Sequence, residues 1–203
     1  MRLVLVRHGE TVAGPGCCVG QADVGLSREG MLAAEELARS WNVGKFSAPT
    51  RLLMSDLVRA RDSASAFVER FKIGGEVDAR LREMSFGAWD GLQWNAIERD
   101  DMLRFRRWAD RWTALAPPGG ETVADLSARA KSVLDELRAR HAATDDTVLI
   151  VSHAGWIRAA LSLLFDEPTS QMLTRPIDYA RATVVNVHAE SAQLIASNTA
   201  KIR

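Results

Sequence analysis

Residues 3–11 read Leu-Val-Leu-Val-Arg-His-Gly-Glu-Thr, an apolar run of four residues that ends abruptly at Arg7, His8 and Gly9. Unbroken apolar runs of this length are typical of strands that are buried on both faces in parallel sheets. The run therefore predicts a strand over residues 3–7 whose carboxyl end carries Arg7 and His8.

A second stretch repeats this arrangement far downstream. Residues 148–151 read Val-Leu-Ile-Val, and residues 152–155 continue as Ser-His-Ala-Gly. Open α/β sheets bind ligands at the carboxyl ends of their strands. We therefore expect His8 and His153 to lie at one ligand site.

The neighbouring residues favour a functional role for both histidines, although a single histidine at a strand end is more often structural. Each is followed within two residues by a glycine, which lets the backbone approach a ligand closely. Arg7 precedes one of them, and its planar guanidinium suits a phosphate group. The pattern predicts paired-histidine chemistry. We interpret His141, in a charged helical segment, and His188, in a late strand, as structural.

The composition bounds the class of protein and its partners. With 203 residues, 47% of them hydrophobic, the chain is long enough to bury a full core as one domain over residues 1–203. Its 26 basic and 26 acidic side chains cancel, so neither a nucleic acid nor an anionic membrane is an expected partner. The apolar run before Arg7 is too short for a signal peptide, and no stretch has the length of a membrane span. We expect a cytoplasmic protein.

The two cysteines are adjacent, at Cys17 and Cys18. Neighbouring residues seldom reach disulfide geometry, and two cysteines without a second ligand pair are too few for a structural zinc site. We expect them to pack a loop, with a redox or nucleophilic role as the alternative. The sequence predicts no metal site and no cofactor.

Strands and helices alternate along the chain, which is typical of an α/β fold with a mostly parallel central sheet covered by helices. In the first helix we expect Leu32 and Leu37 on the buried face, and we expect Gly74 and Gly75 to end the second helix. The pattern predicts, in order, a strand over 3–7, a helix over 27–41, a strand over 51–55, a helix over 56–71, a strand over 77–81, helices in 92–115, a helix over 122–140, a strand over 147–152, a helix over 156–165, and strands near 182–189 and 192–198.

The segment from about 92 to 118 has a different texture and is expected to be a helical insertion. It is rich in Trp, Arg and Asp, with Trp94, Trp108 and Trp112 spaced along it. An aromatic packing stripe is the favoured interpretation of these tryptophans, and direct contact with substrate is the alternative.

The first motif resembles the signature of the histidine phosphatase superfamily, also called the phosphoglycerate-mutase-like family. The resemblance continues in the family's order through four further blocks, at residues 55–60, 81–91, 118–122 and 151–155. It implies a phosphoglycerate-mutase-like fold of three layers, helix, sheet and helix. It also implies a metal-independent phosphatase that acts on a small-molecule phosphomonoester.

By this resemblance, His8 is the nucleophile and forms a phosphohistidine that water later hydrolyses. Its ring is expected to be oriented through its other nitrogen by a backbone carbonyl. Arg7, Arg59 and His153 are expected to neutralise the phosphate oxygens. Glu83 matches the family's acid, which protonates the leaving oxygen and later takes a proton from water.

Two charged residues, Arg59 and Glu121, are expected near the N-termini of helices, where the helix dipole also affects their interpretation. Arg59 is expected in the first turn of its helix, where the helix dipole favours an anion, whereas Arg61 points elsewhere. Glu121 is expected either to bind substrate or to buttress the pocket, and compensation of a helix dipole explains it equally well.

One position departs from the family pattern. Many relatives carry an asparagine six residues after the nucleophile, and this chain has Gly14 there. A nearby backbone N–H or another side chain is expected to substitute for that amide.

The loop at residues 15–24 and the Trp-rich segment at 104–121 resemble those of many bacterial alpha-ribazole phosphatases. This likeness implies alpha-ribazole 5′-phosphate as substrate, with Gly20, Gln21 and Ala154 beside it. A broad sugar-phosphate or phosphoserine phosphatase is the main alternative, and a phosphoglycerate mutase is a weaker one because the chain is short. A noncatalytic module is disfavoured because every core residue is present. A monomer and a homodimer both remain open.

Overall fold

The computed structural model describes residues 1–141 and 144–203. Its centre is a six-stranded sheet in the order β4-β3-β6-β1-β7-β8. The first four of these strands are parallel, while β7 pairs antiparallel with β1 and β8 pairs antiparallel with β7. The strands are β1 (Arg2–Arg7), β3 (Arg51–Met54), β4 (Gly75–Val77), β6 (Thr147–Ser152), β7 (Ala182–Val187) and β8 (Ala192–Thr199).

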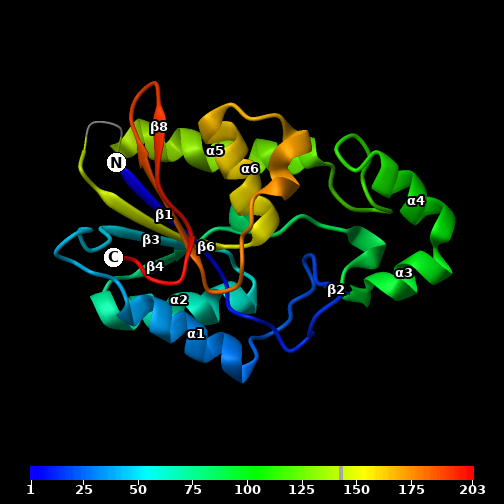
Figure 1. The fold of residues 1–203 in the computed structure, drawn as a ribbon, viewed down its shortest axis with the longest axis horizontal. Helices are drawn as coiled ribbons and strands as arrows, with labels where there is room; N and C mark the ends of the chain where they lie inside the picture. Colours follow the sequence, from blue (N-terminus) through cyan, green and yellow to red (C-terminus); the bar gives the residue numbers. More distant parts are fainter. Residues whose placement is uncertain (142–143) are drawn as a thin grey trace.

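Helices cover both faces of this sheet, so the predicted three-layer α/β fold is confirmed (Figure 1). Leu3 and Leu5 of β1 pack in one cluster with α5 (Val123–His141) and α6 (Ala154–Phe165). Val4 and Val6 point to the other face and pack with α1 (Arg28–Arg39) and α2 (Val58–Phe71). The apolar run of β1 is unbroken because both of its faces are buried.

The remaining elements lie to one side of the sheet, where α3 and α4 stand apart from the other helices (Figure 1). Two helices fill the predicted insertion, and a two-residue ribbon joins residues 17–18 to 92–93. Cys18 packs there with Trp89 and Ile97, and both cysteines are free, in agreement with the packing role. These elements are β2 (Cys17–Cys18), β5 (Leu92–Gln93), α3 (Trp94–Asp100) and α4 (Met102–Asp110). Elsewhere along the chain lie the 3₁₀ helices η1 (Ala79–Leu81), η2 (Gly87–Trp89) and η3 (Thr169–Thr174).

Two details of the first helical layer differ from the prediction. Ser27 caps α1 as expected, but Leu32 is 51% exposed, because it lies about 200° around the helix from the buried Ala34. The helix α2 ends at Phe71, its C-cap residue Lys72 adopts a left-handed conformation with φ 52°, and Gly75 belongs to the next strand.

The strand predicted over residues 77–81 was placed too late. The strand β4 is Gly75–Val77, and residues 79–81 form η1 instead. The Asp78 carboxylate accepts a hydrogen bond from the backbone N–H of Arg80 at 2.8 Å, which turns the chain into this 3₁₀ helix.

The helix α6 begins at Ala154, two residues earlier than predicted, with His153 as an extended N-cap residue. This start places the backbone N–H groups of Ala154 and Gly155 in the first helical turn, directly after the strand-end histidine. Of the helices in the described part of the chain, none is both long and apolar enough to cross a membrane.

Candidate active site

His8 and His153 follow the adjacent parallel strands β1 and β6, whose last residues, Arg7 and Ser152, are register partners. The backbone N–H of His8 donates to Ser152 O at 3.0 Å, which ties the two strand ends together. The two imidazole rings lie 5.0 Å apart between centroids, at 61°, and both histidines are buried. The structure therefore brings the two predicted histidines to one place.

The hydrogen bonds of His8 define its tautomer. Nδ1 lies 2.6 Å from Gly9 O, and Nε2 lies 3.2 Å from Nε of Arg59, which is always a donor. The proton is therefore on Nδ1, and the electron pair of Nε2 accepts the hydrogen bond from Arg59. Burial, Arg59 and Arg7 hold the pKa of His8 well below its usual value, so the ring is neutral.

Arg59 is only 1% exposed and is enclosed by the loop that follows β2. Its Nη2 donates to Gly20 O at 2.6 Å, and its Nη1 donates to Ala22 O at 2.8 Å. Gly20 has φ 50°, and a Cβ there would lie 1.6 Å from a carboxylate oxygen of Asp90. The loop geometry therefore requires glycine at this position. Burial lowers the pKa of Arg59 from an ordinary value far above neutrality, so the group remains a cation.

Arg7 is held beside the histidines by two contacts that the sequence did not predict. Its Nη1 donates to Ile177 O at 2.7 Å, and its guanidinium lies 3.6 Å from the ring centroid of Tyr179. That ring also lies 5.5 Å from the ring of His8. Tyr179 is the chain's single tyrosine and belongs to no motif, so only the tertiary structure identifies it as part of the site.

Glu83 points its carboxylate toward the start of α6. Its Oε2 accepts a hydrogen bond from Gly155 N at 3.2 Å, and its Oε1 accepts one from Met84 N at 3.0 Å. The Gln21 side chain, predicted to contact substrate, donates to the Glu83 carbonyl at 2.9 Å. In the structure Gln21 thus fixes the segment that carries Glu83.

Glu121 buttresses this same segment through Arg129. The Glu121 carboxylate pairs with Arg129 at 2.8 Å and also accepts a hydrogen bond from Ser85 N at 2.9 Å. Arg129 donates to three backbone carbonyls before Met84, those of Arg80, Arg82 and Glu83, at 2.8, 3.1 and 3.3 Å. The start of α5 is capped separately by Thr122 and Asp125, so the buttressing alternative is favoured over dipole compensation.

His8, Arg59 and Glu83 line a small hollow that we call the histidine pocket, with a volume of about 140 Å³. It is lined by Arg7, His8, Cys17, Cys18, Val19, Gly20, Arg59, Glu83, Phe86, Trp94 and Tyr179.

His153 lies against His8 with its ring fully buried, and neither ring nitrogen has a hydrogen-bond partner among the described residues. Burial and the nearby His8, Arg59 and Arg7 hold its pKa well below the usual value. Unsatisfied buried nitrogens are costly, and they are acceptable where a ligand supplies the partner. Ala154, which follows His153, is buried and lies beside the neighbouring cavity described next.

A second hollow of about 330 Å³, the apolar cavity, adjoins the histidine pocket and shares Glu83 and Phe86 with it. Arg158 is the other charged residue of its wall. The remaining lining residues are Met84, Trp108, Ala109, Trp112, Val123, Leu126, Ala154, Gly155, Met172 and Leu173. Glu83 therefore stands between a polar pocket and an apolar one.

The tryptophans of the insertion divide between packing and cavity wall. Trp94 and Trp108 stack at 5.9 Å with 10° between their planes, and Trp108 also contacts Phe86 and Trp89 edge-on. The predicted packing stripe is therefore confirmed for Trp94 and Trp108. Trp108 and Trp112 both line the apolar cavity as well.

Gly14 lies in a turn with φ 72°, and the space around its missing Cβ is open. Its backbone N–H donates to Thr11 O at 3.3 Å, so this N–H is already used and does not replace the family's asparagine amide.

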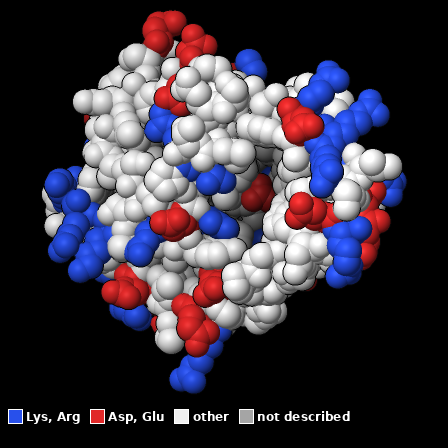
Figure 2. Space-filling view, turned by 45° about the vertical axis from the view of Figure 1, so that its right-hand side comes forward, with Lys and Arg blue, Asp and Glu red and all other residues white. Residues whose placement is uncertain are grey.

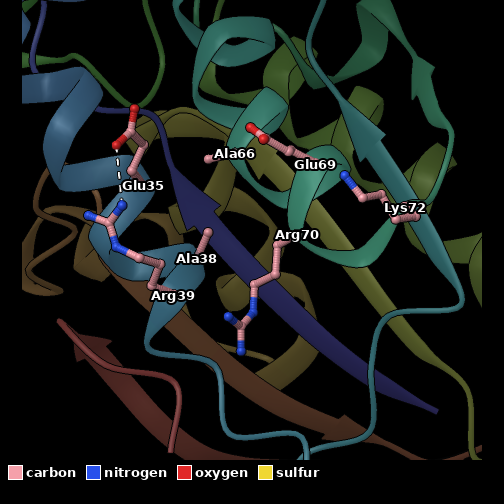
Figure 3. Close-up of a pocket in the computed structure, with 7 residues that line it drawn as sticks. All are labelled: Glu35, Ala38, Arg39, Ala66, Glu69, Arg70 and Lys72. Atoms are coloured by element: carbon pink, nitrogen blue, oxygen red, sulfur yellow. Dashed lines mark hydrogen bonds and ion pairs between the residues drawn. The ribbon is translucent and has the colours of Figure 1, made fainter.

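A further hollow of about 580 Å³ lies between α1 and α2, away from the histidines (Figure 3). Arg39 pairs with Glu35 there at 3.3 Å, and Arg70 turns to the Trp41 carbonyl at 2.7 Å. Its seven lining residues include no histidine or cysteine, so it offers no nucleophile of the kind found between β1 and β6.

Charge and donor sets limit the other chemistries. Within residues 1–141 and 144–203, no three His, Cys, Asp or Glu side chains gather as a metal-binding cluster. Basic and acidic residues are interspersed over the face drawn in Figure 2, in agreement with the balanced composition. The cationic character of the site is therefore local, in Arg7 and Arg59.

Comparisons with known proteins agree with this geometry. The family model described as histidine phosphatase superfamily (branch 1) matches residues 3–200. The chain is 32% identical over 200 residues to the bifunctional protein Rv2228c of Mycobacterium tuberculosis. The matched residues cover 96% of this chain and 52% of that protein. The chain thus spans about half the length of the first of its curated relatives.

Two phosphatases are similar over most of their own length. The glucosyl-3-phosphoglycerate phosphatase of Mycobacterium tuberculosis is 35% identical over 176 residues, covering 83% of this chain and 77% of the relative. The crystal structure of a putative alpha-ribazole-5′-P phosphatase from Escherichia coli superposes with a TM-score of 0.91 at 25% identity, covering 100% of this chain and 98% of the other.

Proposed function

We propose that this chain, which belongs to the histidine phosphatase superfamily, hydrolyses phosphomonoesters through a phosphohistidine formed on His8. One observation carries the proposal. The Nδ1–H of His8 is bound to Gly9 O, so the electron pair lies on Nε2, where it accepts the Arg59 Nε–H beside a pocket lined by Arg7 and Arg59, and the ring of His153 lies 5.0 Å from that of His8. A neutral imidazole nitrogen among fixed cations is suited to attack a phosphoryl group.

In the first step, a bond forms between Nε2 of His8 and phosphorus, and the bond from phosphorus to the leaving oxygen breaks. Arg7 and Arg59 offset the negative charge of the phosphoryl oxygens, which would otherwise repel the nucleophile. The buried ring of His153 supplies a further partner for one of those oxygens, because its nitrogens have no other partner among the described residues. The cations take the place that a divalent ion has in other phosphatases, so we propose a metal-independent reaction.

Glu83 is proposed to donate a proton to the leaving oxygen, because an alkoxide leaves poorly at neutral pH. In the second step water attacks the phosphohistidine, the nitrogen–phosphorus bond breaks, and the Glu83 carboxylate takes the proton of the water. Inorganic phosphate and an alcohol are the products, and Glu83 and His8 return to their starting states. The position of Glu83 between the two hollows supports this role.

We further propose alpha-ribazole 5′-phosphate as substrate, with the alcohol portion in the apolar cavity. The aromatic and aliphatic wall of this cavity favours a leaving group with an apolar part, such as the base of alpha-ribazole. A leaving group that is only a sugar would leave hydroxyl groups unpaired there, and a serine would leave its ammonium group unpaired. The likeness to alpha-ribazole phosphatase and to glucosyl-3-phosphoglycerate phosphatase keeps a sugar-phosphate substrate as the second candidate.

The test is to trap the intermediate and compare substrates. The wild-type chain, quenched during turnover, should carry acid-labile, base-stable phosphate, and His8→Ala should carry none. Chelation of divalent ions should leave turnover unchanged. Full turnover by His8→Ala, or strict dependence on a divalent ion, would contradict the mechanism. A substrate panel with alpha-ribazole 5′-phosphate, phosphoserine and 3-phosphoglycerate then tests the choice of substrate.

A further inference from the structure

The apolar cavity contains one charged group that the proposed chemistry does not use. Arg158 lies on α6 three residues after Gly155, so both face the same side of the helix and both line the cavity. Glu83, the other charged residue of this wall, is already assigned to the leaving oxygen by the proposed function. Arg158 is therefore available to a different part of the leaving group.

The guanidinium of Arg158 is held in place but mostly unpaired. Its Nε donates to Arg175 O at 3.0 Å, and no other hydrogen bond or ion pair to it occurs among the described residues. A guanidinium has five N–H groups and no acceptor, so four donors remain for a ligand. Arg175 is itself paired with Glu167, which fixes the carbonyl that holds Arg158.

The surroundings make these free donors selective. Arg158 is half-buried, and burial lowers its pKa while the nearby Glu83 and Asp178 act to raise it. A ligand that fills the apolar cavity removes water from the guanidinium. A purely apolar ligand would leave these donors unsatisfied, which costs free energy, whereas a ligand with an acceptor restores the lost hydrogen bonds.

We propose that Arg158 selects leaving groups that combine an apolar or aromatic body with a hydrogen-bond acceptor separate from the reacting oxygen. The acceptor is a neutral ring nitrogen or a carboxylate, since both offer lone pairs to a guanidinium. The inference rests on the proposed function in one respect: it assigns the apolar cavity to the leaving group of a phosphomonoester.

The test uses three matched aryl phosphates that differ only at the far end of the ring system. They are 2-naphthyl phosphate, 6-quinolinyl phosphate and 6-carboxy-2-naphthyl phosphate. Arg158→Met keeps the apolar stem and removes the donors. We expect it to lower kcat/KM for the quinolinyl or the carboxynaphthyl ester, or for both, by at least about 10-fold, mainly through KM, and to change the naphthyl ester less than about 2-fold.

The comparison of the esters identifies the acceptor, and the control variants separate an effect on substrate selection from an effect on folding. A loss confined to the quinolinyl ester indicates a ring-nitrogen acceptor, and a loss confined to the carboxynaphthyl ester indicates an anion. Arg158→Lys, which keeps a donor and the charge, should lose less than Arg158→Met. The exposed Arg61→Met is the matched control and should leave all three ratios unchanged.

Two results would overturn the proposal. If the ratio of variant to wild-type kcat/KM is the same for all three esters, Arg158 does not select the leaving group. A uniform fall in kcat with a displaced pH profile means that it acts through Glu83. Calorimetric binding of the corresponding phenols gives the same comparison without catalysis. If wild type binds the phenols selectively but releases no phosphate, the proposed function fails, whereas the ligand preference assigned to Arg158 stands.

Discussion

The backbone N–H of Gly155 donates to Oε2 of Glu83 at 3.2 Å, and a Cβ at position 155 would lie 2.3 Å from Oε1 of the same carboxylate. The absence of a side chain at residue 155 is therefore what allows Glu83 to reach the start of α6. Two residues that are 72 positions apart in the sequence fit together as one unit.

Gly155→Ala should therefore remove activity without unfolding the chain. Alanine favours the helix by up to about 1 kcal/mol over glycine, but its methyl group displaces the Glu83 carboxylate. We expect kcat on an alkyl phosphate to fall by at least about 10-fold, toward the 10²–10⁴-fold range of a lost general acid. In a Glu83→Gln background the same change should add little, and additive losses would show that Gly155 acts elsewhere.

Glu83→Gln should affect poor leaving groups more than good ones. The substitution preserves size and removes the transferable proton, so hydrolysis of an alkyl phosphate should slow by roughly 10²–10⁴-fold. An aryl phosphate needs less protonation, so its phosphorylation step should suffer less. Pre-steady-state phosphorylation measures this step, and equal losses for both leaving groups would argue against the acid role.

The two buried histidines should make stability depend on pH. Their pKa values are lowered in the folded chain, whereas both titrate near the ordinary value of about 6.5 in the unfolded chain. The unfolded chain therefore binds more protons below this value. The stabilisation that comes from keeping the two histidines neutral should be fully present above about pH 6.5. As the pH falls below this value, the free energy of unfolding should decrease by up to about 1.4 kcal/mol per pH unit for each histidine.

Urea unfolding between pH 5 and 7.5 measures this slope, and the His8→Gln/His153→Gln double variant should flatten it. A wild-type slope that persists in the double variant would assign the effect to other groups. The same lowered pKa keeps His8 unprotonated at mildly acidic pH, so the phosphorylation step should not lose its nucleophile as the pH falls through about 6.5.

Glu121→Gln tests the buttress of the Glu83 segment. Arg129 would lose its ionic partner and hold the carbonyls of Arg80, Arg82 and Glu83 less firmly. Because a small displacement of a reacting group is costly, kcat should fall about 10- to 10²-fold for all substrates alike. A rise in KM for one substrate only would instead indicate direct contact between Glu121 and that substrate.

Trp108 and Trp112 should respond differently to replacement by alanine. Trp108 stacks on Trp94, so Trp108→Ala should destabilise the chain by up to about 3–5 kcal/mol and depress all activities. Trp112 lines the apolar cavity outside that stack, so Trp112→Ala should weaken binding of an aromatic leaving group by about 1–3 kcal/mol. Thermal denaturation beside kinetics separates the effects. Unchanged alpha-ribazole 5′-phosphate kinetics in a stable Trp112→Ala chain would exclude that contact.

Local sequence was sufficient to predict a strand where burial alone determined the choice of residues. The run before Arg7 has no polar residue because both faces of β1 are buried, and that pattern located the strand and its histidine. The strand over residues 77–81 was predicted wrongly. The Asp78 carboxylate accepts a hydrogen bond from the backbone N–H of Arg80, and this bond favours a 3₁₀ helix over strand pairing. The hydrophobic pattern of the sequence does not reveal such a bond.

The sequence by itself determined the α/β alternation and the motifs that led to His8, Arg59, Glu83 and His153, because apolar periodicity and short motifs are local properties of the chain. Only the tertiary structure decided what surrounds them. Tyr179 contacts Arg7, and Arg158 lines one cavity with Glu83, and in both cases the segments are far apart in the chain. Such contacts depend on how the helices and loops pack around the sheet, and no spacing within one segment encodes them.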